Sequence, residues 1–227
     1  MPELEARGHQ VEAVDLPQPG DETKDAAGLL DGWAEHVVAR ARNHPEPVVL
    51  VGHSRGGIVI SEAAERAPDR VARLIYCAAM LVDDGETMAA MRARLDASAA
   101  PMVRLQREPD GVMFRADPHS AADFIYSRAA SEDRDPLIDA MVAEPRASFQ
   151  IAPHLSHERY GRVPRAYIEC LHDEAIAIEL QRRMRESQPC DVVITLDADH
   201  APYLSAPQAL ADALDTITRT APTGIER

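Results

Sequence analysis

The sequence predicts an α/β fold with a mostly parallel sheet and an inserted helical cap. Short apolar runs alternate with helical patterns, which is typical of βαβ units. Between residues 81 and 162 the periodicity is weak, and a stretch of that length is too long for a simple connection. The 227 residues, 45% of them apolar, suit one domain with a sizeable core. We therefore expect a core from residues 1–80 and 163–227 and a cap from residues 81–162.

The first elements follow from apolar spacing and turn residues. His9–Asp15 is predicted as a strand, which the prolines and glycine of residues 16–20 end. Residues 26–43 predict a helix, because apolar side chains recur there at helical spacing. A strand at Val48–Val51 comes next, and a helix then runs to a stop at Pro68.

The later elements follow by the same reasoning. We expect, in order, a strand at 74–77, helices at 88–95 and 121–130, a strand within 163–170, a helix at 175–186, a strand at 192–196 and a helix at 207–218. The last seven residues, 221–227, are expected to fray.

Composition narrows the classes of partner. The net charge of −14 and the pI near 5.0 argue against nucleic acid and anionic membranes. Lys24 is the single lysine, so a lysine Schiff base requires Lys24 at the site. Cys77, Cys170 and Cys190 give neither a disulfide framework nor a metal pattern, and the first two are expected to be buried thiols. With no signal peptide and no apolar span, we expect a cytoplasmic protein and leave a homodimer open.

The run Gly52-His53-Ser54-Arg55-Gly56 lies between a predicted strand and a predicted helix. In that context Gly-x-Ser-x-Gly is typical of a nucleophile elbow. The alternative is a chance match to the three fixed positions, which the strand before and the helix after argue against. We expect the glycines to be required because the turn is too sharp for side chains beside the serine. The Arg55 amide would then supply one donor of an oxyanion site.

A serine nucleophile needs a base, and the base needs an acid that orients it. His200 comes four residues after the last predicted strand, and Asp173 comes three residues after Cys170. Both fit the chain order serine, acid, histidine. The alternatives are that His200 is a surface loop residue and that Asp173 only caps the next helix.

Four further side chains are candidates for substrate binding. His53 packs beside the sheet or lines a pocket, and Tyr126, Phe149 and His154 line the acyl or alcohol pocket or pack within the cap. No phosphate loop and no metal-ligand spacing occurs, so we expect no cofactor and no metal.

Several motifs together carry a resemblance that covers nearly the whole chain. They are the elbow, Gly8-His9-Gln10-Val11 with Asp15-Leu16-Pro17, Asp83-Asp84-Gly85-Glu86, residues 163–170, and Asp199-His200-Ala201-Pro202-Tyr203-Leu204-Ser205. The chain resembles the α/β-hydrolases of the plant methylesterase and hydroxynitrile lyase group and their bacterial esterase relatives. The resemblance implies a Ser54, Asp173, His200 triad under a small helical cap, and hydrolysis of a small-molecule ester without a cofactor.

The chain departs from that family at two places. The family begins with further strands and a His-Gly oxyanion segment, which are missing here, so the fold is N-terminally short. Because the missing strand lies between 11–15 and 48–51 in the family, those two must pair directly, or a gap opens. We expect either that Met1 is not the natural start or that a functional part has been lost. The family's lyases carry a lysine just after the catalytic histidine, where this chain has Ala201.

These observations favour a serine esterase in which Ser54 attacks, His200 moves the proton and Asp173 orients His200. Two alternatives stay open. One is a hydroxynitrile-lyase-like enzyme that uses Ser54 and His200 as acid and base. The other is a catalytically weakened hydrolase fold that binds a small ligand, since one oxyanion segment is missing.

Overall fold

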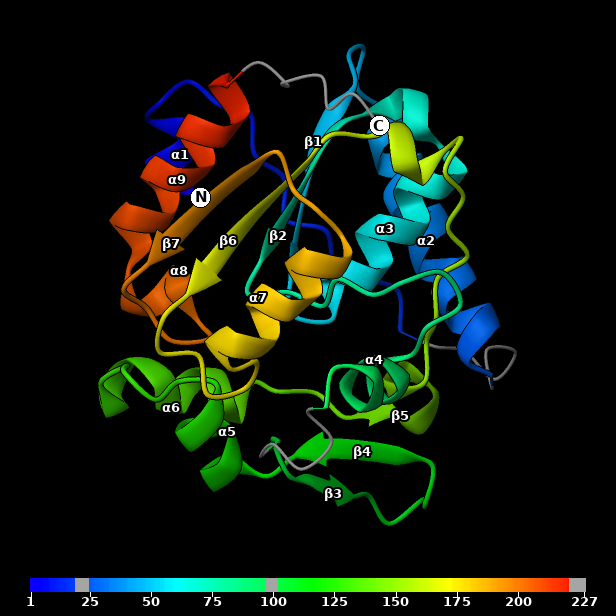
Figure 1. The fold of residues 1–227 in the computed structure, drawn as a ribbon. Helices are drawn as coiled ribbons and strands as arrows, with labels where there is room; N and C mark the ends of the chain where they lie inside the picture. Colours follow the sequence, from blue (N-terminus) through cyan, green and yellow to red (C-terminus); the bar gives the residue numbers. More distant parts are fainter. Residues whose placement is uncertain (19–24, 97–101, 221–227) are drawn as a thin grey trace.

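The computed structural model describes residues 1–18, 25–96 and 102–220 (Figure 1). Its main sheet has four strands in the order β1-β2-β6-β7, and every neighbouring pair is parallel. The strands are β1 Val48–His53, β2 Val71–Cys77, β6 Arg165–Cys170 and β7 Val192–Leu196. Since all four run in one direction, their carboxyl ends meet at one edge, where ligands of open α/β sheets bind.

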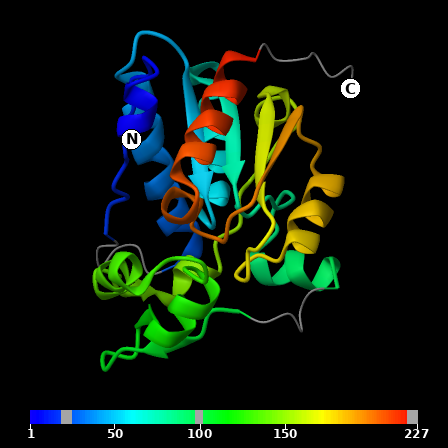
Figure 2. The ribbon, with the colours of Figure 1, turned by 90° about the vertical axis from the view of Figure 1, so that its left-hand side faces the viewer.

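Helices cover both faces of this sheet (Figures 1 and 2). One face packs against α2 Ala26–Arg42, α3 Gly56–Arg66 and α7 Ile178–Ser187, and the other against α9 Pro207–Arg219, which contacts the short α1 Pro2–Glu5. Successive side chains of β2 alternate between the two cores: Leu74 and Tyr76 join the first, while Ile75 and Cys77 join the second. Both faces of β2 are therefore buried, as expected for a parallel sheet between helices.

The chain between β2 and β6 forms an insertion below the carboxyl edge of the sheet (Figure 1). It contains α4 Met88–Arg94, α5 Pro118–Phe124 and α6 Ser131–Asp139, with three short antiparallel strands β3 Leu105–Arg107, β4 Met113–Ala116 and β5 Glu144–Pro145. The described chain also has three 3₁₀ helices. They are η1 Pro68–Arg70, which precedes β2, and η2 Arg146–Phe149 and η3 Tyr160–Arg162, which lie between β2 and β6. The three strands were not predicted, because they are too short to show an alternating pattern.

Most predicted elements are confirmed, but the helix at 121–130 is wrong. Here α5 ends at Phe124 and α6 begins at Ser131, so the predicted range straddles the break between them. The Asp117 side chain accepts a hydrogen bond from the Ser120 amide at 2.8 Å and starts α5 earlier than its apolar pattern indicates.

The strand predicted at residues 9–15 is also wrong, because this segment has no strand assignment and pairs with none of the described strands. It is separated from β1 by a cavity of about 940 Å³, lined by Val11 and Val14 on one side and Val49 and Val51 on the other. The Val51 side chain is 48% exposed although it belongs to a strand. Of the two expected outcomes, the structure thus has the gap, and β1 is an edge of the described sheet.

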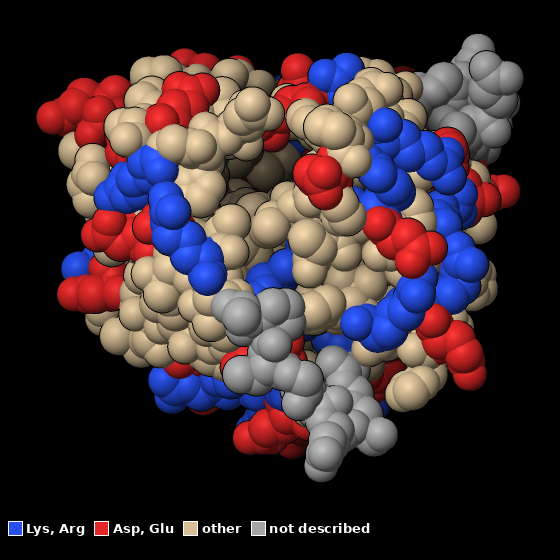
Figure 3. Space-filling view, turned by 90° about the horizontal axis from the view of Figure 1, so that it is seen from above, with Lys and Arg blue, Asp and Glu red and all other residues tan. Residues whose placement is uncertain are grey.

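Several other expectations can be compared with the described residues. Cys77 and Cys170 are buried thiols, as predicted. Lys24 and residues 221–227 lie outside the described part of the chain. None of the described helices is long and apolar enough to cross a membrane. On the face opposite the insertion, acidic and basic side chains are interspersed (Figure 3).

Candidate active site

The turn between β1 and α3 places Ser54 at the carboxyl edge of the sheet. Ser54 has φ of +53°, in the left-handed region that non-glycine residues seldom occupy. Two backbone hydrogen bonds hold this conformation, from the Ser54 amide to the Cys77 carbonyl at 3.4 Å and from the Met80 amide to the Ser54 carbonyl at 2.8 Å. The backbone after β2 therefore fixes the turn that carries the serine.

The glycines of the turn differ in what they permit. A Cβ built on Gly52 would lie 2.8 Å from the Gly56 backbone, and one on Gly57 would lie 2.2 Å from the Met80 carbonyl oxygen. A Cβ on Gly56 would meet no atom within 4 Å. The expectation that only glycine fits beside the serine therefore holds at Gly52 but not at Gly56. Gly57, where an added Cβ would make the closest contact, was not predicted.

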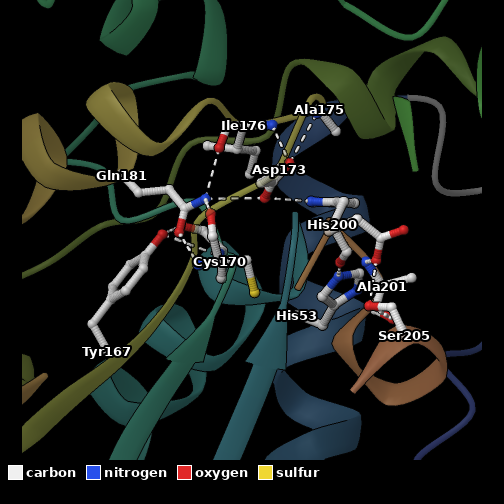
Figure 4. Close-up of polar contacts among 12 residues, drawn as sticks. His53, Tyr167, Cys170, Asp173, Ala175, Ile176, Gln181, His200, Ala201 and Ser205 are labelled. Atoms are coloured by element: carbon white, nitrogen blue, oxygen red, sulfur yellow. Dashed lines mark hydrogen bonds and ion pairs between the residues drawn. The ribbon is translucent and has the colours of Figure 1, made fainter. Parts of the chain in front are cut away.

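Asp173 and His200 meet across the loops that follow β6 and β7. His200 Nδ1 lies 2.9 Å from Asp173 Oδ2, and both residues are buried, with 3% and 4% of their surface exposed (Figure 4). The other oxygen, Asp173 Oδ1, accepts the amides of Ala175 and Ile176 at 2.8 and 2.7 Å. Asp173 therefore accepts hydrogen bonds in the turn before α7 and also contacts the imidazole, so the two interpretations of this residue are not exclusive.

Gln181 completes the surroundings of Asp173 and was missed from the sequence. This fully buried amide on α7 donates to Asp173 Oδ2 at 3.1 Å and to the Ile176 carbonyl at 2.7 Å (Figure 4). Its oxygen accepts the Cys170 amide at 3.2 Å. The available signal was a polar residue between the apolar Leu180 and Met184 on the buried side of a helix.

His53, the second residue of the elbow motif, supports His200 from below. Its Nε2 lies 2.6 Å from the His200 carbonyl oxygen, and the two ring centroids are 4.6 Å apart (Figure 4). Burial and repulsion from His200 lower the pKa of His53 to about 3. His53 is therefore neutral near pH 7, and because a carbonyl can only accept, its Nε2–H donates.

Ser54 and His200 line one cavity of about 680 Å³, which lies between the insertion and the carboxyl edge of the sheet. Tyr126 and Phe149, two of the predicted substrate-binding residues, line the same cavity, as does His53. His154 is placed elsewhere: it is exposed, and its amide donates to Glu62 of α3 at 2.8 Å. The prediction for His154 is therefore wrong, because the end of the insertion packs along α3 rather than over the serine.

Arg55 connects the elbow to the insertion. Its guanidinium pairs with Glu144 of β5 and lies 4.6 Å from the centre of the Phe149 ring. Burial lowers the pKa of Arg55, and the carboxylate of Glu144 opposes that effect. Arg55 is also the N-cap of α3, so its amide lies at a helix start where N–H groups have no acceptor within the helix.

Among the described residues, no group of three histidine, cysteine, aspartate or glutamate side chains could hold a metal ion. The described chain thus offers a serine, a histidine–aspartate pair and helix-terminal amides around one cavity. These groups can together perform acyl transfer.

Comparisons with known proteins identify the family of the chain. A profile described as "Alpha/beta hydrolase family" matches residues 1–213. The chain is 29% identical to methylesterase 2 of Arabidopsis thaliana, over 94% of the chain and 87% of that protein. It is 32% identical to a pyrethroid hydrolase of Sphingobium wenxiniae, over 94% of the chain and 79% of that protein. A relative from Arabidopsis thaliana whose name places it in the chloroplast is longer, and the chain spans 59% of its length.

Solved structures of hydrolases also superpose on this chain. Polyneuridine aldehyde esterase superposes with a TM-score of 0.79 at 27% identity, covering 96% of this chain and 91% of that one. A pyrethroid hydrolase from Sphingobium faniae superposes with a TM-score of 0.77 at 28% identity, covering 95% and 88%. The chain therefore belongs to the alpha/beta hydrolase family, in the group of ester hydrolases that includes the plant methylesterases.

Proposed function

We propose that this protein hydrolyses small-molecule carboxylic esters through a covalent intermediate on Ser54. His200 acts as the base, Asp173 orients His200, and the Arg55 amide donates to the oxyanion. The observation that supports this most is the buried Asp173–His200 hydrogen bond at 2.9 Å beside a cavity that Ser54 also lines.

The steps follow from these positions. When His200 donates its Nδ1–H to Asp173, its Nε2 remains to accept the Ser54 proton as the hydroxyl oxygen attacks the ester carbonyl. The protonated imidazole then gives that proton to the leaving alkoxide, which departs as an alcohol. Water, deprotonated by His200, next attacks the acyl-enzyme. As the bond from the acyl carbon to the Ser54 oxygen breaks, His200 returns the proton to that oxygen and the carboxylic acid is released. In each attack the carbonyl oxygen gains charge, which the Arg55 amide at the start of α3 stabilises.

The lining of the cavity indicates which esters fit. Arg55 and Glu144 are the only residues with fixed charge among its described lining residues, and they neutralise each other. Most of the remaining lining is apolar and includes Met80, Met88, Met102 and Met141. Methionine side chains adapt to irregular shapes. We therefore propose an uncharged ester with apolar groups, held beneath the insertion acting as a cap.

The names of relatives fit this proposal. Two of these relatives are named as esterases, methylesterase 2 and polyneuridine aldehyde esterase, and a third is named as a hydrolase of pyrethroids. A lyase that acts on cyanohydrins receives less support, because Ala201 follows His200 where the family's lyases carry a lysine.

The test compares release of p-nitrophenol from a p-nitrophenyl ester with release of aldehyde from a cyanohydrin. We expect ester turnover by the natural protein, none by Ser54→Ala, and no cyanohydrin cleavage. Ser148→Ala is a matched control, since the buried Ser148 hydroxyl has no hydrogen-bond partner among the described residues. Aldehyde release without ester turnover would instead identify a lyase. Ligand-induced thermal stabilisation without turnover of either substrate would identify a binding protein.

A further inference from the structure

Asp199 is a buried carboxylate to which the proposed reaction gives no role. The residue is fully buried, and no Lys, Arg or His forms an ion pair with it in the described part of the chain. Three donors contact it instead: the amides of Arg128 and Ala201 at 2.8 and 3.0 Å, and the Ser205 hydroxyl at 2.7 Å. Burying a carboxylate costs several kcal/mol of free energy unless hydrogen bonds or ion pairs compensate. The burial of Asp199 therefore needs an explanation.

The three donors come from two separate parts of the chain. Ala201 and Ser205 belong to the loop and short helix α8 Pro202–Ser205 that directly follow His200 (Figure 4). Arg128 belongs to the insertion, in the turn between α5 and α6. Asp199 Oδ1 takes both donors from the His200 side, and Oδ2 takes the donor from the insertion. The carboxylate thus joins the insertion to the segment that carries the imidazole.

Other contacts strengthen the same junction. The Arg128 guanidinium pairs at 3.0 Å with Asp197, two residues before Asp199 in the chain. Tyr126, two residues before Arg128, lines the cavity, as does Tyr203. The turn of the insertion that carries Arg128 therefore contacts Asp197 and Asp199, and through Tyr126 it also faces the space in which a substrate would lie.

The segment 197–201 has no helix or strand of its own to define its path. A backbone hydrogen bond from the His172 amide to the Ala198 carbonyl at 3.0 Å holds it, and other contacts that hold it involve side chains. Asp199 is the most buried polar residue of the segment. We propose that Asp199 is a positioning residue: it fixes the His200 loop against the insertion, so that a substrate contacting Tyr126 also stabilises the imidazole in place. This inference rests on the proposed function, because it concerns the placement of the same base.

Asp199→Asn tests the proposal with almost no change of shape. An amide has an acceptor on one side only, so its NH₂ must face either the Arg128 amide or the Ala201 and Ser205 donors. A misplacement of about 1 Å can cost about 10²-fold in rate. We expect kcat to fall about 10- to 100-fold while KM stays within about 3-fold and unfolding remains cooperative. Ser205→Ala, which removes one donor of three, should have a smaller effect in the same direction.

The matched control is Asp84→Asn. The Asp84 carboxylate also accepts a backbone amide, that of Leu155 at 2.7 Å, but it does not line the cavity. We expect this variant to keep its kcat. The proposal is overturned if folded Asp199→Asn keeps a natural kcat, or if its loss of kcat only follows a loss of folded protein that the control shares.

Amide hydrogen exchange at Arg128 and Ala201 gives a readout that does not need turnover. In Asp199→Asn we expect at least one of these amides to exchange 10-fold faster or more, with the core amides of β2 unchanged. Unchanged exchange at both positions would overturn the proposed link between insertion and loop. If the natural protein hydrolyses no ester, the proposed function fails, and this exchange measurement still decides whether Asp199 joins the two parts.

Discussion

The start of α3 should tolerate a methyl group at Gly56 but not at the next residue, Gly57. Both positions are glycine, adjacent in the chain, and in the first turn of the same helix. A Cβ on Gly57 would lie 2.2 Å from the Met80 carbonyl oxygen, whereas a Cβ on Gly56 would meet nothing within 4 Å. The pair therefore isolates one contact between the elbow helix and the chain after β2.

The magnitude follows from what must move. An ordinary contact of this kind needs more than 3.4 Å, so the Met80 backbone must shift by over 1 Å. Met80 cannot shift alone, because its amide donates to the Ser54 carbonyl at 2.8 Å. Overpacking costs about 1–3 kcal/mol and the lost hydrogen bond about 1 kcal/mol. We expect Gly57→Ala to lower the free energy of unfolding by about 2–4 kcal/mol, or about 4–16 °C in Tm.

Gly56→Ala should be neutral or slightly stabilising, by up to about 1 kcal/mol, because alanine is the better helix former. Urea unfolding followed by circular dichroism measures both variants, and ester turnover reports whether Ser54 has moved. We expect only Gly57→Ala to lose activity. Equal stability of the two variants would refute the steric argument, as would a damaging Gly56→Ala beside a harmless Gly57→Ala.

Three further predictions concern the residues around His200. Asp173→Asn should lower kcat about 10³- to 10⁴-fold, since the amide can hold the wrong imidazole tautomer; a change under 10-fold in steady-state kinetics would contradict the role of Asp173. Gln181→Met should cost about 1–3 kcal/mol and lower kcat, because the Cys170 amide and Asp173 each lose a partner; unchanged urea unfolding would argue against the network. His53 has a folded-state pKa of about 3, below the ordinary value near 6.5, so the unfolded chain binds more protons between these values. The stabilisation that neutral His53 contributes is therefore complete above about pH 6.5 and is lost as the pH falls toward 3, by at most about 3 kcal/mol at pH 4.5. His53→Asn should reduce the dependence of the free energy of unfolding on pH across that range. An unchanged dependence in the variant would contradict this role of His53.

Features set by local spacing or by chain order could be predicted from the sequence. The helix at 26–43 and the strand at 192–196 follow from periodicity, and the structure has α2 and β7 there. The choice of Asp173 and His200 rested on their positions after predicted strands, which a parallel sheet brings to one edge. The structure places their side chains in hydrogen-bond contact.

Features that depend on distant partners could not be predicted. Residues 9–15 have a strand-like pattern, but a strand needs a neighbour, and a cavity separates this segment from β1. The contact of Gly57 with Met80 arises only when α3 packs over the end of β2. Gln181 likewise gains its importance from long-range pairing with Asp173, which spacing along the chain does not reveal.

One side of β1 has no strand beside it in the described sheet. The Ser54 amide donates to Cys77 of β2, and donors alternate along a strand, so the amides of Val51 and His53 point away from β2. That side faces the cavity beside residues 9–16. Within the described part of the chain, these two amides therefore have no strand partner.

The central claim is that Ser54 forms a covalent bond to the acyl group of an ester. Mass spectrometry of protein quenched within the first turnovers of a p-nitrophenyl ester tests it directly. We expect a mass increase equal to the acyl group, located on the peptide that contains Ser54 and absent from Ser54→Ala. Ester hydrolysis that continues in Ser54→Ala, or an acyl group found only on another residue, would contradict the account.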